Sequence, residues 1–272
     1  MEEFHQSDLK KIFLPSQTSH KGENGKVLII GGSKLFHAAS LWSLEIASKI
    51  VDMVFYSSVP ENNAIVQSLK EAWRNGIIVE RSKIDDYLKE ADAVLIGPGL
   101  PREEGIEEGD DDTKELTKRL LNAYPDKKWV IDGGSLQVIS PDSIPQNAIL
   151  TPHHLEFQKL FGITGTEASC QEMAKKYNCI IVLKGQEDII CSPNSCTRII
   201  GGNAGMTKGG TGDVLAGLVV GLLAKNEPFL AAKAASFINK KAGENLYQKV
   251  GVYFNASDLV QEIPSVMKEL LL

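Results

Sequence analysis

The chain has 272 residues, a formal net charge of −6, and 43% hydrophobic residues. This composition is ordinary for a globular protein and is rich enough in apolar residues for a sizeable core. Because an acidic chain without a basic patch repels a phosphate backbone, we expect no nucleic-acid partner. The polar, acidic start is not typical of a signal peptide, and no apolar run reaches the roughly 18–20 residues of a membrane span. We therefore expect a soluble, cytoplasmic protein.

Short apolar runs alternate with helical segments over much of the chain. The strand-like runs are Lys26–Gly31, Met53–Tyr56, Gly76–Glu80, Ala93–Gly97, Trp129–Asp132, Ala148–Leu150 and Cys179–Leu183. Helical spacing of apolar residues is clearest in Ala38–Val51 and Ala64–Trp73. This alternation predicts an α/β fold with a mostly parallel central sheet and helices on both faces. A single domain spanning residues 1–272 is the simplest account.

The pattern changes after Lys184. Asp188–Cys191 and Thr197–Ile200 are separated by a short polar segment, which predicts an antiparallel hairpin at the sheet edge in the C-terminal part. Helical patterns follow in Asp213–Ala224, Pro228–Tyr247 and Ala256–Leu271. The acidic segment Arg102–Asp112 favours a solvated loop over a metal site.

Four cysteines occur in the chain, at positions 170, 179, 191 and 196. They lack C-x-x-C spacing and have no histidine nearby, so they do not indicate a zinc site. Cys191 and Cys196 could face each other across the predicted hairpin. We nevertheless expect free thiols, because the cytoplasm is reducing.

A glycine-rich loop leads directly into an apolar helix at Gly209-Gly210-Thr211-Gly212-Asp213. A helix that is apolar nearly all round is buried, so its free N–H groups and positive dipole end lie in a low-dielectric place. Glycines let a ligand approach the backbone closely, so the loop predicts a phosphate site. It is not a Walker A loop, because Lys208 precedes the glycines, and Gly31-Gly32-Ser33 is no dinucleotide fingerprint.

Asp213 has two interpretations. An acidic residue in the first turn can simply complement the helix dipole. A carboxylate beside a phosphate, however, repels it, so we favour a second role in which Asp213 orients an acceptor hydroxyl and takes its proton during phosphoryl transfer. On this interpretation the dipole keeps Asp213 ionised at neutral pH.

Several separated segments together resemble the ADP/ATP-dependent NAD(P)H-hydrate dehydratases of the ribokinase-like superfamily. The segments are GNAGMTKGGTGDVLAG, KVLIIGGS, Ala38-Ala39, IGPGL, VIDGGSL, LTPHHLEFQKLFG and VLKGQEDII. The resemblance covers roughly residues 25 to 270 and implies a ribokinase-like fold. It implies ADP- or ATP-dependent dehydration of the S epimer of hydrated NADH or NADPH, by phosphorylation of the added hydroxyl and elimination of phosphate. This is a carbon–oxygen lyase activity in metabolite repair.

The same resemblance assigns residues to roles. Asp213 would be the catalytic base, and the N–H groups of Gly210, Thr211 and Gly212 would hold the transferring phosphoryl group. Hydrated nicotinamide nucleotide would contact Ala39, Gly99, His153 and Asp213. The adenine nucleotide would contact Lys184, Gly185, Gln186, Glu187, Asp188 and Gly212. Mg²⁺ is expected with the phosphates, although no ligand cluster is visible, and the family suggests a homo-oligomer.

Taken without the resemblance, three of these positions have simpler explanations. Gly97-Pro98-Gly99 can be a tight turn, although it ends a parallel strand, where open sheets bind ligands. His153 can be a capping or packing residue, with Glu156 completing a capping box. Lys184 can be a solvent-exposed turn residue.

Two segments depart from the family pattern: residues 132–136 lose one carboxylate of the usual DADAL, and residues 152–156 replace PHPGE. Lys208 could add a phosphate contact. Two alternatives therefore stay open, a small-alcohol kinase of the hydroxymethylpyrimidine or thiazole type and a non-catalytic nucleotide-binding sensor. The sequence leaves undecided ATP against ADP, NADH hydrate against NADPH hydrate, the metal ligands and the oligomeric state.

Overall fold

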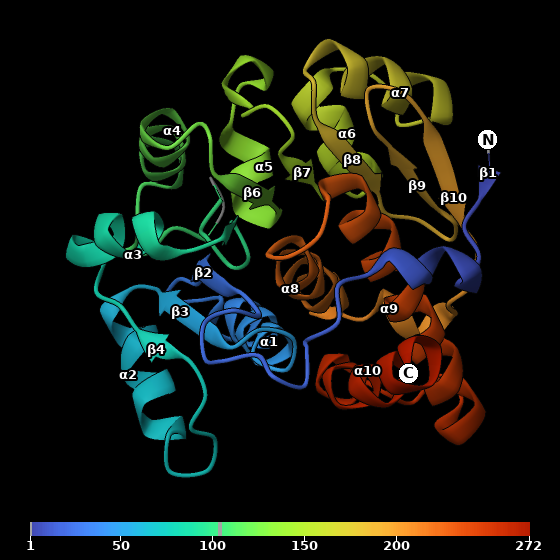
Figure 1. The fold of residues 1–272 in the computed structure, drawn as a ribbon. Coiled ribbons are helices and arrows are strands. Elements are labelled where there is room, and N and C mark those ends of the chain that lie inside the picture. Colours follow the sequence, from blue (N-terminus) through green and yellow to red (C-terminus); the bar gives the residue numbers. More distant parts are fainter. Residues whose placement is uncertain (1, 103–104) are drawn as a thin grey trace.

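The computed structural model describes residues 2–102 and 105–272 and contains one large sheet (Figure 1). Its strands are β1 (Glu2–Glu3), β2 (Lys26–Ile30), β3 (Met53–Ser57), β4 (Ile77–Ile78), β5 (Ala93–Ile96), β6 (Lys128–Ile131), β7 (Ile149–Leu150), β8 (Ile180–Leu183), β9 (Asp188–Cys191) and β10 (Cys196–Ile199). Their order across the sheet is β1-β10-β9-β8-β7-β6-β5-β2-β3-β4. Of the described strands, β9 runs opposite to the rest, so the sheet is mostly parallel, as predicted.

Helices cover both faces of this sheet. They are α1 (His37–Ala47), α2 (Pro60–Leu69), α3 (Ile84–Glu90), α4 (Thr113–Ala123), α5 (Gly133–Val138), α6 (His154–Phe161), α7 (Glu167–Lys176), α8 (Thr211–Leu223), α9 (Pro228–Val250) and α10 (Ala256–Leu271). Short 3₁₀ turns occur at Gln6–Lys11, Arg81–Lys83, Pro141–Ser143 and Ala204–Thr207. Helices α1, α2 and α8 to α10 pack on one face and α3 to α7 on the other.

Alternate residues of each central strand enter different halves of the core. In β2, Val27 and Ile29 pack with α1 and α8, whereas Leu28 and Ile30 pack with the opposite helix layer. All four side chains are fully buried. A strand covered on both sides has no polar face, which explains why these strands are continuous apolar runs in the sequence. Two hydrophobic layers therefore hold the sheet between them.

The hairpin of β9 and β10 forms where the sequence predicted it. The two-residue β1 pairs in parallel with β10 and lies beyond it at the sheet edge. Cys191 and Cys196 face each other across the hairpin and form a disulfide. The expectation of free thiols was therefore wrong for this pair, because the strand register brings the two side chains together. Cys170 and Cys179 are free and buried.

One predicted helix is shifted along the chain. We expected a helix over Ala64–Trp73, but α2 begins at Pro60 and ends at Leu69. Pro60 occupies the first helical turn, where its missing N–H costs nothing, and Val59 before it is extended. Proline therefore fixed the start of this helix more strongly than the apolar pattern did.

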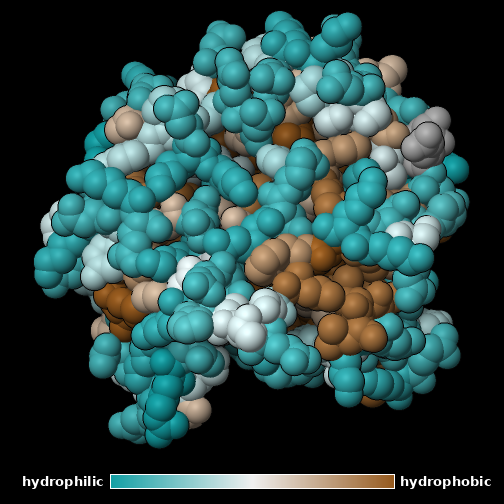
Figure 2. All heavy atoms as spheres, viewed as in Figure 1, coloured by the Kyte–Doolittle hydropathy of each residue, from teal (hydrophilic) through white to brown (hydrophobic). Residues whose placement is uncertain are grey.

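The surface seen in the view of Figure 1 is largely hydrophilic, with a hydrophobic area in the region of α8 to α10 (Figure 2). Helix α8 itself is buried almost along its whole length. Among the described helices, none combines the length and hydrophobicity needed to cross a bilayer.

Candidate active site at the start of helix α8

Helix α8 begins at the predicted phosphate loop. Gly210 caps it with a φ of +95°, a left-handed conformation that residues with a Cβ rarely adopt. A Cβ at Gly210 would also lie 2.3 Å from the Trp42 ring on α1. Glycine is therefore required here both by the backbone and by the packing. Since the first N–H groups of a helix have no partner within it, the residues after Gly210 can present donors to a ligand, although the Thr211 N–H already donates to the carbonyl oxygen of Lys208 at 3.4 Å.

Asp213 lies in the first turn of α8 and is partly buried. Burial, and then the nearby carboxylate of Asp132, raise the pKa of the Asp213 carboxyl to about 7, although Lys184 acts in the opposite direction. The expectation that the helix dipole keeps this group well ionised was therefore wrong, because desolvation and like charge outweigh it. A carboxyl near pKa 7 is suited to accept and release a proton at neutral pH.

Lys184 directly follows β8 and points to a buried carboxylate rather than to solvent. Its Nζ lies 3.1 Å from Oδ1 of Asp132, which follows β6. The Thr151 hydroxyl donates to the same Oδ1 at 2.6 Å. Burial alone would lower the pKa of Lys184, but Asp132 and Glu156 outweigh it, so the pKa is raised. The interpretation of Lys184 as an exposed turn residue is thus excluded, and the ammonium is held charged.

His153 is the N-cap of α6. Its Nδ1 accepts a hydrogen bond from the N–H of Glu156 at 3.2 Å, and the Glu156 carboxylate accepts one from the N–H of His153 at 3.0 Å. The capping box suggested by the sequence is therefore present. His153 also forms an isolated parallel bridge with Lys184. This bridge places the segments that follow β7 and β8 side by side.

One cavity of about 820 Å³ unites all six predicted nucleotide-binding residues with the start of α8. Its lining includes His153, Lys184, Gly185, Gln186, Glu187, Asp188, Thr211 and Gly212. The wall is completed by Ile200, Gly201, Gly202, Asn203, Ala204, Met206, Thr207, Leu215, Asn239 and Lys240. The sequence assigned no role to any residue of this second group, although residues 202–207 and Leu215 belong to the glycine-rich segment that carried the resemblance. Ile200 and Gly201 precede that segment, and Asn239 and Lys240 come from α9.

Ala39 and Gly99 lie together, outside the lining of that cavity. A Cβ at Gly99, where φ is +69°, would be 3.1 Å from the Ala39 Cβ and 2.7 Å from the carbonyl oxygen of Phe36. Helix α1 joins this region to the first turn of α8, because the Ser43 hydroxyl donates to the carbonyl oxygen of Asp213 at 2.7 Å. The structure thus arranges most of the predicted residues in two groups, one along the cavity and one around Ala39 and Gly99.

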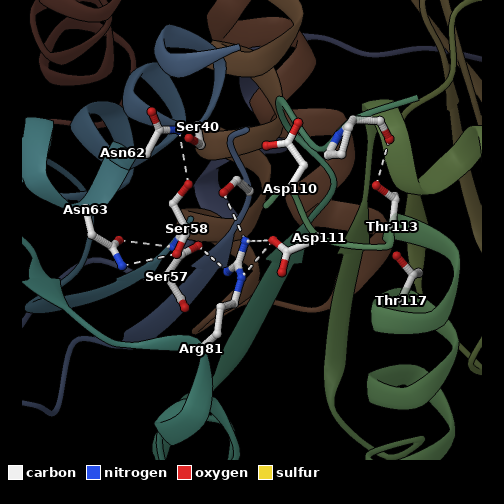
Figure 3. A network of polar contacts seen from close by, with 12 residues as sticks. Ser40, Ser57, Ser58, Asn62, Asn63, Arg81, Asp110, Asp111, Thr113 and Thr117 are labelled. Carbon is white, nitrogen blue, oxygen red and sulfur yellow. Dashed lines mark hydrogen bonds and ion pairs between the residues drawn. The ribbon is translucent and has the colours of Figure 1, made fainter. Parts of the chain in front are cut away.

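A polar network connects Arg81 and Asp111 with the loops that follow β2 and β3 (Figure 3). The Arg81 guanidinium is 2.7 Å from Asp111 and also donates to the carbonyl oxygens of Ser57 and Gly31. Asp110 accepts from the N–H of Lys34. The acidic segment is therefore tied to the ends of β2 and β3 through these residues rather than being a purely solvated loop. Glu103 and Glu104 lie outside the described residues.

Lys208 does not turn toward the phosphate loop. Its ammonium donates to the carbonyl oxygens of Val252 and Phe254. The phosphate contact considered from the sequence is therefore absent in this conformation. Within residues 2–102 and 105–272, no group of three or more His, Cys, Asp or Glu side chains is arranged to hold a metal ion.

Comparison with known proteins gives consistent matches. A family model described as NAD(P)H-hydrate dehydratase matches residues 27–265. The bifunctional NAD(P)H-hydrate repair enzyme Nnr of Methanocaldococcus jannaschii is 38% identical over 271 residues, covering 96% of this chain and 52% of the relative. The ADP-dependent (S)-NAD(P)H-hydrate dehydratase of Nitrosopumilus maritimus is 35% identical over 284 residues, covering 96% and 95%. The chain thus spans about half of the first relative and nearly all of the second.

Solved structures share the fold. A ribokinase-like superfamily protein from Enterococcus faecalis has a TM-score of 0.86 at 24% identity, covering 99% of this chain and 96% of that one. The ADP/ATP-dependent NAD(P)H-hydrate dehydratase from Bacillus subtilis, co-crystallized with ATP/Mg²⁺, has a TM-score of 0.82 at 23% identity, covering 99% and 98%. The prediction of a ribokinase-like fold is confirmed.

Proposed function

The chain belongs to the NAD(P)H-hydrate dehydratase family, and from this we propose that it restores hydrated NADH and NADPH, acting on their S epimer at the expense of ADP or ATP. The observation that carries the proposal is the single cavity in which the first turn of α8 meets the loop Lys184–Asp188. A nucleotide held by that loop has its phosphates directed to the helix N-terminus, where free N–H groups stabilise negative charge.

In the proposed reaction, the ring hydroxyl of the hydrated cofactor attacks the terminal phosphorus of the nucleotide. Asp213 takes the hydroxyl proton as the new O–P bond forms and the bridging P–O bond breaks, which releases AMP from ADP or ADP from ATP. The N–H groups of Gly210, Thr211 and Gly212 hold the transferring phosphoryl group. Phosphate then leaves with cleavage of the C–O bond, the neighbouring ring carbon loses a proton, and the double bond returns.

The two groups of predicted binding residues fit a reaction in which the nucleotide first phosphorylates the hydrated nicotinamide. We assign the hydrated nicotinamide to Ala39 and Gly99, with His153 at the junction, and the adenine nucleotide to the loop Lys184–Asp188 and Gly212. Lys184, which is held charged by Asp132, supplies a positive charge beside the phosphates. Ser43 fixes the carbonyl of Asp213 to α1, so the base and the nicotinamide side are positioned together.

Mg²⁺ is proposed to arrive with the nucleotide phosphates, which commonly carry it in phosphoryl transfer. The B. subtilis protein was co-crystallized with ATP/Mg²⁺, and the N. maritimus protein is named ADP-dependent. We further propose a cytoplasmic location, where reduced nicotinamides are used, one domain spanning 1–272, and a homo-oligomer. Cell fractionation and light scattering test the location and the oligomer.

The proposal is tested by incubating purified protein with chemically hydrated NADH, Mg²⁺ and either ADP or ATP. We expect the absorbance of reduced nicotinamide to return together with stoichiometric release of phosphate. Omitting the nucleotide is the control and should abolish recovery. A stable phosphate ester of another small alcohol, with no recovery of NADH, would instead identify a small-alcohol kinase. Nucleotide binding without any turnover would identify a sensor.

A further inference from the structure

The proposed nucleotide cavity has a wall whose residues were assigned no role from the sequence. Helix α9 contributes Asn239 and Lys240, and the neighbouring wall carries the apolar side chains of Ile200, Met206 and Leu215. Apolar side chains beside a few polar groups are the usual lining of a site for a flat ring system. The polar groups on this wall are therefore candidates for recognition of the nucleotide base.

Four polar residues of the lining are buried: Asp188, Thr211, Asn239 and Lys240. All but Asn239 have hydrogen-bond or ion-pair partners within the protein. Lys240 and Asp188 form an ion pair at 3.4 Å, and Asp188 also accepts from Ser236 at 2.6 Å. The Thr211 hydroxyl lies 2.7 Å from the carbonyl oxygen of Met206. These three side chains hold the walls of the cavity together. Asn239 is the fourth.

Asn239 differs because its Oδ1 is buried without a hydrogen-bond partner among the described residues. The side chain is only 5% exposed. An unsatisfied buried acceptor destabilises the fold, and native proteins rarely retain one unless a ligand or water satisfies it. Since Asn239 lines the cavity, a ligand there is the natural partner for its amide.

We propose that the Asn239 side-chain amide recognises the adenine base of the nucleotide, an inference that rests on the proposed use of ADP or ATP. An amide offers one acceptor and one donor side by side. The adenine edge offers the complementary pair, an exocyclic amino donor beside a ring-nitrogen acceptor, and asparagine pairs with adenine in this bidentate way in DNA complexes. Ile200, Met206 and Leu215 would contact the faces and rim of the ring.

The test is a thermodynamic cycle between the side chain and the base. Calorimetry measures the Kd of ADP and of purine riboside 5′-diphosphate, which lacks only the amino group, for the wild type and for Asn239→Leu. We expect the wild type to prefer ADP by about tenfold or more, the scale of one bidentate pair. Asn239→Leu should bind both ligands with nearly equal, weaker affinity, because the group that senses the amino group is gone.

Two further variants control the cycle. Asn239→Asp keeps the shape and an acceptor for the amino group but repels the ring nitrogen, so it should weaken ADP binding yet still favour ADP over the purine analogue. Asn122→Leu replaces an exposed asparagine on α4 and should bind like the wild type. Circular dichroism and melting curves establish that each variant is folded, and the aspartate variant keeps the test decisive if leucine prevents folding.

The outcomes separate this inference from the proposed function. If folded Asn239→Leu discriminates between the two ligands as well as the wild type does, Asn239 does not read the base, whereas recovery of NADH by the wild type still supports the function. If the wild type binds ADP with Asn239-dependent preference but restores no NADH, the inference stands and the proposed reaction is wrong. If the wild type does not bind ADP or ATP, both are overturned.

Discussion

The carboxyl group of Asp213 lies beside the proposed phosphate site, yet its charge opposes a bound phosphate less than that of an ordinary carboxylate would. Its pKa of about 7 means that the group is close to half protonated at neutral pH. Asp132 contributes to this rise, while Lys184 limits it. Asp213 can therefore gain or lose a proton near neutral pH. This property follows from the burial of the carboxyl group, which the sequence motif did not reveal.

Replacing Asp213 by asparagine removes the base but keeps the size of the side chain. We expect kcat to fall by about 10²–10⁴, the usual contribution of a positioned base. Nucleotide affinity should be retained or improved, because one negative charge beside the phosphates is lost. Steady-state kinetics with hydrated NADH and calorimetry with ADP measure the two effects. Turnover equal to that of the wild type would exclude Asp213 as the base.

The pH dependence of the reaction should report the same group. A base must be ionised, so kcat/KM should rise with pH through about 7 and level off above it, losing about tenfold per unit below that value. The measurement is a pH series of initial rates at low concentrations of hydrated NADH. An acidic limb near pH 4 would mean that Asp213 ionises like an exposed carboxyl and that its burial has no kinetic consequence.

The residues of the GGTGD loop were predictable because their chemistry is contiguous in sequence. Asn239 and Asp132 were not assigned roles, since a polar residue inside a buried helix or at a strand end resembles any other until the surrounding walls are known. His153 has one feature that the sequence predicts and one that only the fold determines. Its capping box with Glu156 is local and was predicted, but its position on the cavity depends on the pairing of distant segments.

At the scale of elements, the ion pair of Asp188 and Lys240 joins the hairpin to α9. Both side chains are 8% exposed. Asp188→Ala should lower the free energy of unfolding by about 3 kcal/mol, because it leaves the Lys240 charge buried without its carboxylate. Urea unfolding measures the loss, and Asp188→Ala combined with Lys240→Met should recover part of it.

The neighbouring residue provides the matched control. Glu187 pairs with Arg198 at 3.3 Å, but both side chains are more than two-fifths exposed. Glu187→Ala should therefore cost less than about 1 kcal/mol. Equal losses for the two alanine variants would show that burial does not distinguish these pairs.

The central strands were predictable because burial on both faces requires continuous apolar runs. β1 was not, since Glu2 and Glu3 carry no strand pattern and are placed only by pairing with β10. The disulfide was missed for a different reason. The sequence suggested the register that places Cys191 opposite Cys196, but the assumed compartment argued against the bond.

At the scale of the whole molecule, the raised pKa of Asp213 links stability to pH. A carboxyl whose pKa is higher in the folded than in the unfolded state stabilises the fold at low pH, and this contribution is lost between about pH 4 and 7 as the pH rises. Asp213→Asn should therefore be more stable than the wild type at pH 8, and this advantage should shrink toward pH 4. Unfolding at both pH values measures the difference; a wild type that is the more stable at pH 8 would contradict it.

The sheet order also bears on how the molecule is made. Every strand precedes α8 in the chain, but one face of the sheet is covered largely by α8 to α10. A nascent chain that has emerged only to the hairpin therefore leaves that apolar face open, and domains with such surfaces aggregate readily. Until residues 211–223 leave the ribosome, this face of the sheet lacks α8 and the molecule lacks the proposed phosphate-binding turn. Folding and the gain of activity should consequently coincide once α8 to α10 have emerged.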